Sequence, residues 1–276
     1  MHKVNGNGAP IPALGFGTWE LRDAQARHMV EAALEIGYRH IDTAQMYGNE
    51  AEVGAALRAS GLKRDELFVT TKIWPDRFRS GDLQRSVVES LEKLQLDAVD
   101  LLLLHWPNPD VPLPETMVAL NDCAERGWAR HIGVSNFTAA MLVEAMRLSS
   151  HPLATNQVEY HPFLSQRTVL EACRTNGMAL TAYCPLARGR VFEDPTLARI
   201  AQRHGKTAGQ VALRWLVQQE GVVAIPRSSR VEHARANFQI FDFSLSEPEM
   251  VEIAALGKPE GRIVAVGGSV PAWDPT

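Results

Sequence analysis

The sequence of 276 residues has few cysteines: Cys123, Cys173 and Cys184. Their number is odd, they are widely spaced, and no two of them form a C-x-x-C pair. A disulfide framework uses cysteines in pairs, and structural zinc sites usually draw on closely spaced cysteines. We therefore expect neither, and predict that the three side chains are core thiols.

The chain also lacks a long apolar run and a large charge of either sign. It has no stretch of about 18 apolar residues, the length that indicates a transmembrane helix. Its first residues, Met1 to Gly6, contain no apolar segment of the kind found in a secretory signal. A formal net charge of -4 provides no general attraction to nucleic acid or anionic lipid. We predict a cytoplasmic protein, with no nucleic-acid or membrane partner.

Short β-branched or apolar runs alternate with amphipathic stretches, which is typical of repeated βα units around a parallel sheet. A closed barrel of eight such units takes about 250 residues. We therefore predict one α/β domain over residues 1–276, a (β/α)8 TIM barrel. The predicted strands are Leu14–Gly17, Arg39–Asp42, Leu67–Lys72, Val99–His105, Ala129–Val134, Thr155–Val158, Ala179–Tyr183 and Val222–Ile225.

Four further segments complete this prediction. Helices are expected at Ala24–Ile36, closed by Gly37, and at Thr207–Gln218, which has an apolar face. The Asn-Gly turns after Val4 predict an N-terminal β-hairpin that plugs the bottom of the barrel. The Gly- and Pro-rich tail, Gly257–Thr276, predicts a loop, which we place over the active-site mouth, and not a ninth unit.

Polar residues close several of the predicted strands. Asp42, Lys72 and His105 end consecutive strands, about 30 residues apart, the length of one βα unit. Any one of them could be a satisfied polar group or a helix cap, as Asp42 could be. Three ionisable groups buried together are costly without a function, and the active site of a barrel lies at the carboxyl ends of its strands. We expect all three to face one cavity.

This cluster suits the reduction of a carbonyl, which needs a hydride and a proton. Tyrosine, with a pKa near 10, is a reluctant proton donor until a nearby cation stabilises its phenolate. Tyr47 and Lys72 form such a pair, with Asp42 expected to ion-pair with Lys72. A neutral His105 would donate a ring N–H to the carbonyl oxygen.

Other patterns carry less weight. Gly15-Phe-Gly-Thr-Trp19 begins like a dinucleotide fingerprint but has no third glycine. Glu159 and His161 have no further metal ligands at usable spacing, and the same holds for the pair His28 and Glu31. We assign these pairs structural or surface roles and predict no metal.

Eight blocks of sequence resemble the aldo-keto reductase superfamily, in the same order and over essentially the whole chain. The resemblance is closest to the short bacterial 2,5-diketo-D-gluconate reductases and methylglyoxal reductases. The blocks are Gly15–Trp19, Arg39–Glu50, Thr70–Trp74, Asp100–Pro107, Ile132–Phe137, Asn156–Glu159, Ala182–Leu186 and Ile225–Ser228, followed by Arg262-Ile-Val and Pro271-Ala-Trp-Asp274.

The resemblance implies that Asp42, Tyr47, Lys72 and His105 are the catalytic residues. It also implies that the chain binds a nicotinamide cofactor. Ser135, Asn136 and Gln157 would bind the carboxamide of this cofactor, and Tyr183 would stack on its nicotinamide ring. The positions that we assign to the cofactor are Gly17, Thr18, Asp42, Ser135, Asn136, Gln157, Tyr183, Pro185, Leu186, Arg188, Ile225, Arg227, Ser228, Ser229, Arg230, His233 and Asn237. Those that we assign to the substrate are Trp19, Met46, Trp74, His105, Trp106 and Trp273, although each tryptophan could also be core.

The residues after the eighth strand favour NADPH. Arg227, Ser228 and Arg230 suit the 2′-phosphate, because a guanidinium binds phosphate bidentately. Many relatives have Lys, Arg and Glu in this motif, where this chain has Arg227, His233 and Ala236. His233 is uncharged over much of the physiological range, so NADH is a possible second cofactor.

We predict an enzyme, an NADPH-dependent reductase of small aldehydes or ketones, acting as a monomer. Methylglyoxal, 2,5-diketo-D-gluconate, β-keto esters and aromatic aldehydes are the candidate substrates. A Schiff-base lyase is an alternative, because Lys72 at a strand end also suits that chemistry, although a neighbouring Asp42 would keep it protonated. A non-catalytic nucleotide sensor on the same fold is a second alternative.

Overall fold

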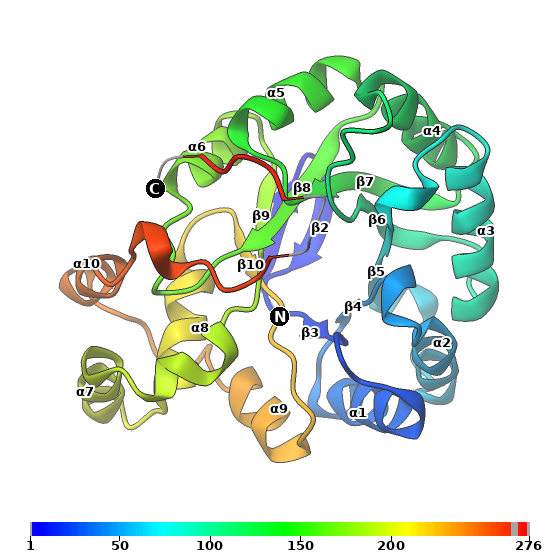
Figure 1. Cartoon of the computed structure of the whole chain (residues 1–276). Helices are drawn as coiled ribbons and strands as arrows, with labels where there is room; N and C mark the ends of the chain where they lie inside the picture. Colours follow the sequence, from blue (N-terminus) through cyan, green and yellow to red (C-terminus); the bar gives the residue numbers. More distant parts are fainter. Residues whose placement is uncertain (1, 266–269, 275–276) are drawn as a thin grey trace.

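The computed structural model describes residues 2–265 and 270–274 of the chain. Eight parallel strands, hydrogen-bonded in sequence order, curl around a centre that helices surround (Figure 1). Parallel bridges from Leu14 to Ala224 and from Gly17 to Arg227 join the first strand to the last. The predicted (β/α)8 barrel is therefore confirmed. Its strands are β3 (Phe16–Gly17), β4 (His40–Asp42), β5 (Phe68–Ile73), β6 (Val99–Leu104), β7 (Ala129–Ser135), β8 (Leu153–Glu159), β9 (Ala179–Tyr183) and β10 (Val222–Ala224).

The central strands β5 and β6 are buried along their whole length because both of their faces are covered, and β6 is apolar except for Asp100. Every residue of β6, from Val99 to Leu104, is buried. Such continuous burial is what a parallel strand between a filled barrel and outer helices requires. All eight predicted strands are present, with boundaries that differ by at most two residues, and Ala179–Tyr183 has the predicted bounds.

The helices form the outer ring of the barrel (Figure 1). They are α1 (Asp23–Ile36), α2 (Glu50–Ala59), α3 (Asp82–Leu94), α4 (Leu113–Glu125), α5 (Ala139–Leu148), α6 (Arg167–Thr175), α7 (Pro195–His204), α8 (Ala208–Gln218), α9 (Val231–Phe238) and α10 (Glu247–Ala254). As predicted, Gly37 ends α1, with φ of 123°, a conformation that favours glycine. Thr207 caps α8, its hydroxyl accepting a hydrogen bond from the Gln210 N–H at 3.2 Å.

The predicted N-terminal hairpin is present. Strands β1 (Lys3–Gly6) and β2 (Ala9–Pro12) pair antiparallel, and the turn places Asn7 at φ 47° and Gly8 at φ 92°. The Asn7 amide donates to the Leu153 carbonyl at 2.8 Å. Because Leu153 begins β8, the hairpin is attached to the amino-terminal end of the barrel, opposite the ends where the polar residues gather.

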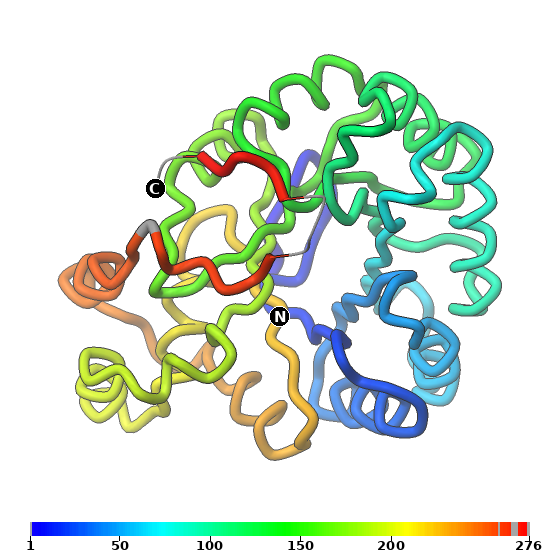
Figure 2. The backbone as a smooth tube through the Cα atoms, in the orientation of Figure 1, coloured from blue at the N-terminus to red at the C-terminus, as the bar shows by residue number. Residues whose placement is uncertain are grey.

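The described parts of the tail lie over the face of the barrel, and residues 270–274 lie beside α5 and α6 (Figure 1 and Figure 2). In the described part of the tail, the only regular element is a short 3-10 turn at Pro259–Gly261, so there is no ninth unit. Residues 266–269 and 275–276 of the predicted loop Gly257–Thr276 lie outside the described residues. No helix within residues 2–265 and 270–274 is long and apolar enough to span a membrane.

Candidate active site

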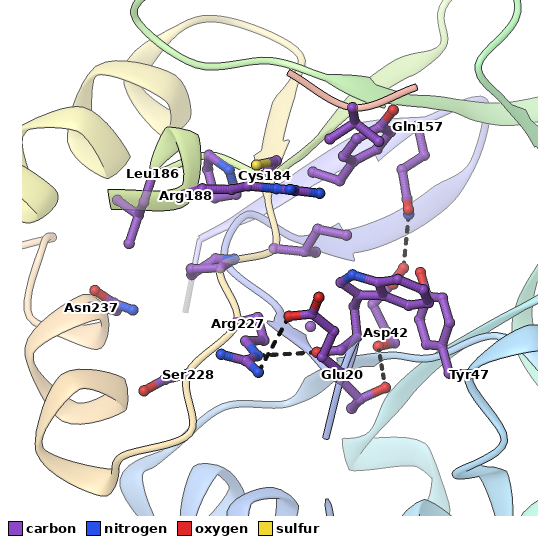
Figure 3. A pocket seen from close by; sticks show the side chains of 18 of the residues that line it. Glu20, Asp42, Tyr47, Gln157, Cys184, Leu186, Arg188, Arg227, Ser228 and Asn237 are labelled. Carbon is purple, nitrogen blue, oxygen red and sulfur yellow. Dashed lines mark hydrogen bonds and ion pairs between the residues drawn. The ribbon is translucent and has the colours of Figure 1, made fainter. Parts of the chain in front are cut away.

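A cavity of about 840 Å³ opens at the carboxyl ends of the strands. Its volume is in the range of cavities that bind cofactors and small molecules. The cavity is elongated: Tyr47 and Asp42 lie at one end, Ser228 and Asn237 at the other, and Arg227 between them (Figure 3). We call the part around Tyr47 and Asp42 the catalytic end, and the part from Arg227 to Ser228 and Asn237 the nucleotide end.

Lys72 lies beneath the floor of the catalytic end. It belongs to β5 and its side chain is 0% exposed. Its ammonium group donates to Asp42 Oδ1 at 2.5 Å, to the Thr43 carbonyl at 2.8 Å and to the Tyr47 hydroxyl oxygen at 3.2 Å. An ammonium group has three protons, so these acceptors satisfy it fully. The predicted ion pair of Asp42 with Lys72 is thus present.

Asp42 is held from both sides. It ends β4, and its second carboxylate oxygen, Oδ2, accepts a hydrogen bond from the Gln157 amide at 2.8 Å. The Gln157 side chain comes from β8, across the barrel. A buried carboxylate needs such partners to remain ionised. The Asp42–Lys72 pair is therefore a fixed charge pair.

Tyr47 projects from a short 3-10 turn, Gln45–Tyr47, that follows β4. Its ring packs between those of Trp19 and His105, with centroid distances of 4.9 Å and 5.6 Å. Burial raises the pKa of Tyr47 above 10, although the Lys72 charge acts in the opposite direction. The phenol is consequently protonated at neutral pH. Because Lys72 donates to its oxygen, the hydroxyl proton remains available to a ligand.

His105 follows β6 directly and is buried. Burial, together with the Lys72 charge, lowers its pKa well below 6.5, so the ring is neutral at physiological pH. Trp74 packs edge-on against the ring, with a centroid distance of 5.1 Å. A neutral imidazole carries one N–H donor, and this is the form that the role expected for His105 requires.

Side chains from three strand ends form a hydrogen-bonded layer beside His105. The Ser135 hydroxyl donates to the Gln157 carbonyl at 2.7 Å. The Asn136 amide donates to the His105 carbonyl at 3.0 Å, and its oxygen accepts from the Tyr183 hydroxyl at 2.8 Å. Asn136 has a φ of 65°, a left-handed conformation that asparagine tolerates better than most residues.

The nucleotide end is more open. The Arg227 guanidinium donates to the Trp19 carbonyl at 3.1 Å and lies 3.5 Å from a Glu20 carboxylate oxygen. The side chains of Arg227 and Glu20 are 37% and 58% exposed. Figure 3 shows this contact between Arg227 and Glu20 within the cavity. Positive charge at this end is therefore partly neutralised by a neighbouring carboxylate.

The cavity gathers most of the predicted site residues. Those that line it are Gly17, Thr18, Trp19, Asp42, Met46, Tyr47, Trp74, His105, Trp106, Ser135, Asn136, Gln157, Tyr183, Pro185, Leu186, Arg188, Ile225, Arg227, Ser228, Ser229, His233 and Asn237. Lys72, Arg230 and Trp273 are not among the described residues that line the cavity, so Lys72, which we expected to face it, lies behind Asp42 and Tyr47 instead. Arg230 lies 3.6 Å from the Glu232 carboxylate on the surface. Trp273 packs behind Trp106, with a centroid distance of 6.1 Å.

Other lining residues were not predicted. They are Glu20, Cys184, Gly189, Phe192, Thr207, Pro226, Ala236, Val264 and Ala265. Cys184 corrects the expectation of three core thiols: Cys123 and Cys173 are buried, whereas Cys184 is only partly buried and lines the cavity. Its place between Tyr183 and Pro185, two predicted site residues, was the available sign. The described residues contain no group of three or more histidine, cysteine or acidic side chains that could hold a metal ion.

Comparisons with known proteins agree with this geometry. Residues 13–258 match the family model described as "Aldo/keto reductase family". Methylglyoxal reductase DkgB of Salmonella typhi is 42% identical over 267 residues, which cover 96% of this chain and 99% of that protein. A crystal structure named provisionally as a 2,5-diketo-D-gluconic acid reductase B is 52% identical with a TM-score of 0.98, covering 100% and 98% of the two chains. The aldose reductase of Schistosoma japonicum is 33% identical with a TM-score of 0.88, covering 94% of each chain.

Proposed function

The chain belongs to the aldo/keto reductase family of oxidoreductases, whose members use NAD(P)H, and on that premise we propose a specific reaction. The protein reduces small aldehydes and ketones to alcohols, with NADPH as the hydride donor and Tyr47 as the proton donor. The observation that carries this proposal is the contact of the Lys72 ammonium with both the Tyr47 hydroxyl and Asp42. It places a protonated phenol next to a fixed cation at the floor of the cavity.

Proton transfer is the step that these residues perform. Tyr47 gives its hydroxyl proton to the carbonyl oxygen as the hydride adds to the carbonyl carbon. The phenolate that remains is stabilised by Lys72 at 3.2 Å. Positioned proton donors of this kind contribute about 10² to 10⁴ in rate. Asp42 keeps Lys72 charged and in place, and takes no proton itself.

His105 orients the substrate. As a neutral ring it donates its N–H to the carbonyl oxygen and stabilises the negative charge that develops there. Its position is held by Trp74 and by the Asn136 amide on its backbone carbonyl. The aromatic wall of Trp19, Trp74 and Trp106 surrounds this oxygen site. Such a pocket suits a small carbonyl compound with an apolar or compact remainder.

The cavity residues fit a nicotinamide dinucleotide. When bound, this cofactor supplies the hydride. Ser135, Asn136 and Gln157 would hold its carboxamide, and Tyr183 would lie against its ring. Arg227 at the nucleotide end would bind the 2′-phosphate of NADPH. With one partly neutralised guanidinium and an exposed His233 there, NADH is expected as a weaker second cofactor.

The names of the relatives and the shape of the pocket are the basis for the substrates that we propose. Relatives are named for methylglyoxal and for 2,5-diketo-D-gluconic acid. β-Keto esters and aromatic aldehydes share the reacting group and an apolar remainder. We propose these four classes, in each of which a single carbonyl oxygen meets Tyr47 and His105.

The Schiff-base lyase is the less favoured reading. A lysine nucleophile must lose a proton and reach the substrate. Lys72 instead donates to three acceptors, is fully buried, and has a pKa raised above 10.5 because Asp42 and Tyr47 outweigh the effect of burial. Borohydride reduction in the presence of substrate should therefore trap no adduct.

The decisive experiment follows NADPH oxidation by absorbance, with methylglyoxal as substrate, for the wild type and for Tyr47→Phe. We expect turnover by the wild type and a loss of about 10³-fold or more in the variant. NADPH binding, measured by fluorescence titration, should stay within a few-fold. If NADPH binds but no carbonyl in a broad panel is reduced, the protein is a nucleotide sensor and the proposal fails.

We further propose that the protein works in the cytoplasm as a monomer. The three thiols are free in the described structure, which suits a reducing compartment. Sedimentation of the purified protein tests the oligomeric state, and a stable dimer would contradict it.

A further inference from the structure

Glu159 is a buried carboxylate outside the proposed catalytic machinery. It is the last residue of β8, and its side chain is 0% exposed. One oxygen accepts from the backbone N–H of Ile263 at 2.7 Å, and the other from that of Val264 at 3.0 Å. His161 lies 3.0 Å from the first oxygen. Of the pair Glu159 and His161, to which we assigned a structural role, Glu159 thus binds the C-terminal tail.

Arg262 extends this contact toward the cavity wall. Its guanidinium lies 3.8 Å from Glu159 Oε2 and stacks over the Trp273 ring at 3.6 Å. Trp273 in turn packs edge-on against Trp106, which lines the cavity. The two described parts of the tail, on either side of residues 266–269, are therefore joined through one arginine.

A second attachment holds the end of the tail. The Asp274 carboxylate accepts a hydrogen bond from the backbone N–H of Ala139, at the start of α5, at 2.9 Å. Of the two attachments, the Glu159 contact lies nearer the cavity, because Val264 and the following Ala265 both line it.

We propose that Glu159 is a positioning residue that determines which carbonyl substrates the enzyme accepts. By binding the N–H groups of Ile263 and Val264, it holds Val264 and Ala265 as part of the cavity wall. Charged acceptors form stronger hydrogen bonds than neutral ones, so a carboxylate at this position holds the segment firmly. The effect falls on substrate binding, because these wall residues carry no group that transfers protons.

The role in substrate choice rests on the proposed reductase function, but the attachment itself does not. Glu159→Gln tests both, because glutamine preserves the shape and removes the charge. Glu249→Gln is the matched control. Glu249 also accepts a backbone N–H, from Ser246 at 2.8 Å, and also has histidine and arginine partners, at 3.1 Å from His204 and 2.9 Å from Arg203. It lies on α10 and does not line the cavity.

The first measurement is hydrogen–deuterium exchange of the segment 262–265 in the full-length protein. We expect exchange there to become about tenfold faster or more in Glu159→Gln, and to stay unchanged in Glu249→Gln. Unchanged exchange in a folded Glu159→Gln protein overturns the attachment. This result does not depend on whether the protein is a reductase.

The second measurement compares KM and kcat for methylglyoxal and for a bulkier aromatic aldehyde. In Glu159→Gln we expect KM for the aromatic aldehyde to change about tenfold, with kcat and NADPH affinity within about twofold. Equal changes in the Glu249→Gln control would show a general loss of stability and overturn the positioning role. Absence of turnover in the wild type refutes the proposed function and with it the role in substrate choice, but leaves the exchange result standing.

A tail variant keeps the test decisive if Glu159→Gln does not fold. Arg262→Met removes the positively charged partner of Glu159 from the tail, keeps the N–H groups of Ile263 and Val264, and leaves the barrel residues intact. We expect faster exchange of 262–265 and the same direction of KM change, with a smaller magnitude. If both variants fold, their effects should be less than additive, because they weaken one connection. Full additivity would contradict the proposal.

Discussion

The catalytic end and the nucleotide end of the cavity are held together in different ways. At the catalytic end, Lys72 and Asp42 are buried and every proton of the ammonium group has an acceptor. At the nucleotide end, Arg227 and Glu20 are exposed and meet at 3.5 Å. Charge pairs in water contribute little, whereas breaking a buried pair leaves an uncompensated charge. The first end is therefore preorganised, and the second can rearrange around a ligand.

The two ends differ in this way because their residues come from different parts of the fold. Asp42, Lys72 and His105 lie at strand ends, whose positions the barrel determines, and Tyr47 lies on the short turn that follows β4. Arg227 and Ser228 come from the loop after β10, which has fewer constraints. Substitutions at the catalytic end should change chemistry or stability strongly, and those at the nucleotide end should change cofactor affinity moderately.

The largest effect is expected for Lys72→Met, which keeps the length of the side chain and removes its charge. The Tyr47 phenolate loses its stabilising cation and Asp42 loses its partner. We expect kcat to fall about 10²- to 10⁴-fold, with NADPH affinity within a few-fold, by steady-state kinetics and fluorescence titration. Lys206→Met, which removes a surface pair with Asp242 at 2.6 Å, is the control and should leave kcat unchanged. Comparable losses in both variants would refute the contrast.

The next effect concerns stability at acidic pH. Burial lowers the pKa of His40, beside the catalytic end on β4, from 6.5 to about 4. Between these values the unfolded state binds a proton that the folded state does not, so stability falls as the pH falls. From pH 7 to pH 5 this amounts to about 2 kcal/mol in the free energy of unfolding.

Urea unfolding at the two pH values measures this change. His40→Gln should reduce the pH dependence by about 2 kcal/mol. His233→Gln, at the exposed nucleotide end, should leave it unaltered. If His40→Gln has the same pH dependence as the wild type, the buried histidine is not its source.

A moderate effect is expected for Arg227→Met. Hydrogen bonds to charged groups contribute about 1.5 to 3 kcal/mol, so the Kd for NADPH should rise about 10- to 100-fold while that for NADH changes little. Fluorescence titration with both cofactors provides the values. Arg230→Met is the matched control, because Arg230 does not line the cavity in the described structure. An equal loss of NADPH affinity in that variant would support the original assignment of Arg230 to the phosphate.

The smallest effect is expected for Glu20→Gln. Removing the carboxylate frees Arg227 for a phosphate, and exposed pairs contribute about 0.2 to 1 kcal/mol. NADPH should bind up to about fivefold more tightly, and the gain should diminish at high salt because exposed charges are screened. Glu232→Gln, beside Arg230, serves as the control. Weaker NADPH binding in Glu20→Gln would show that Glu20 assists the cofactor.

Much of the catalytic end could be predicted because its signals are local. An apolar strand that ends in one polar residue identifies Asp42, Lys72 and His105 in turn, and the barrel brings such ends together. The eight strands and the hairpin follow from patterns within a few residues. Cys184 was misjudged because composition says nothing about which way a single side chain points.

The sequence by itself determined the barrel, its eight strands and the residue types at the strand ends. The signals for these features, the spacing of apolar residues and the residues that favour turns, lie within short segments of the chain. Only the tertiary structure decided that Arg227 meets Trp19 and Glu20, and that Glu159 binds Ile263 and Val264. These partners lie far apart along the chain, and hydrogen bonds between loops depend on how the whole barrel closes. No periodic pattern in the sequence predicts these contacts, because each one depends on two distant segments of the chain coming together in the folded protein.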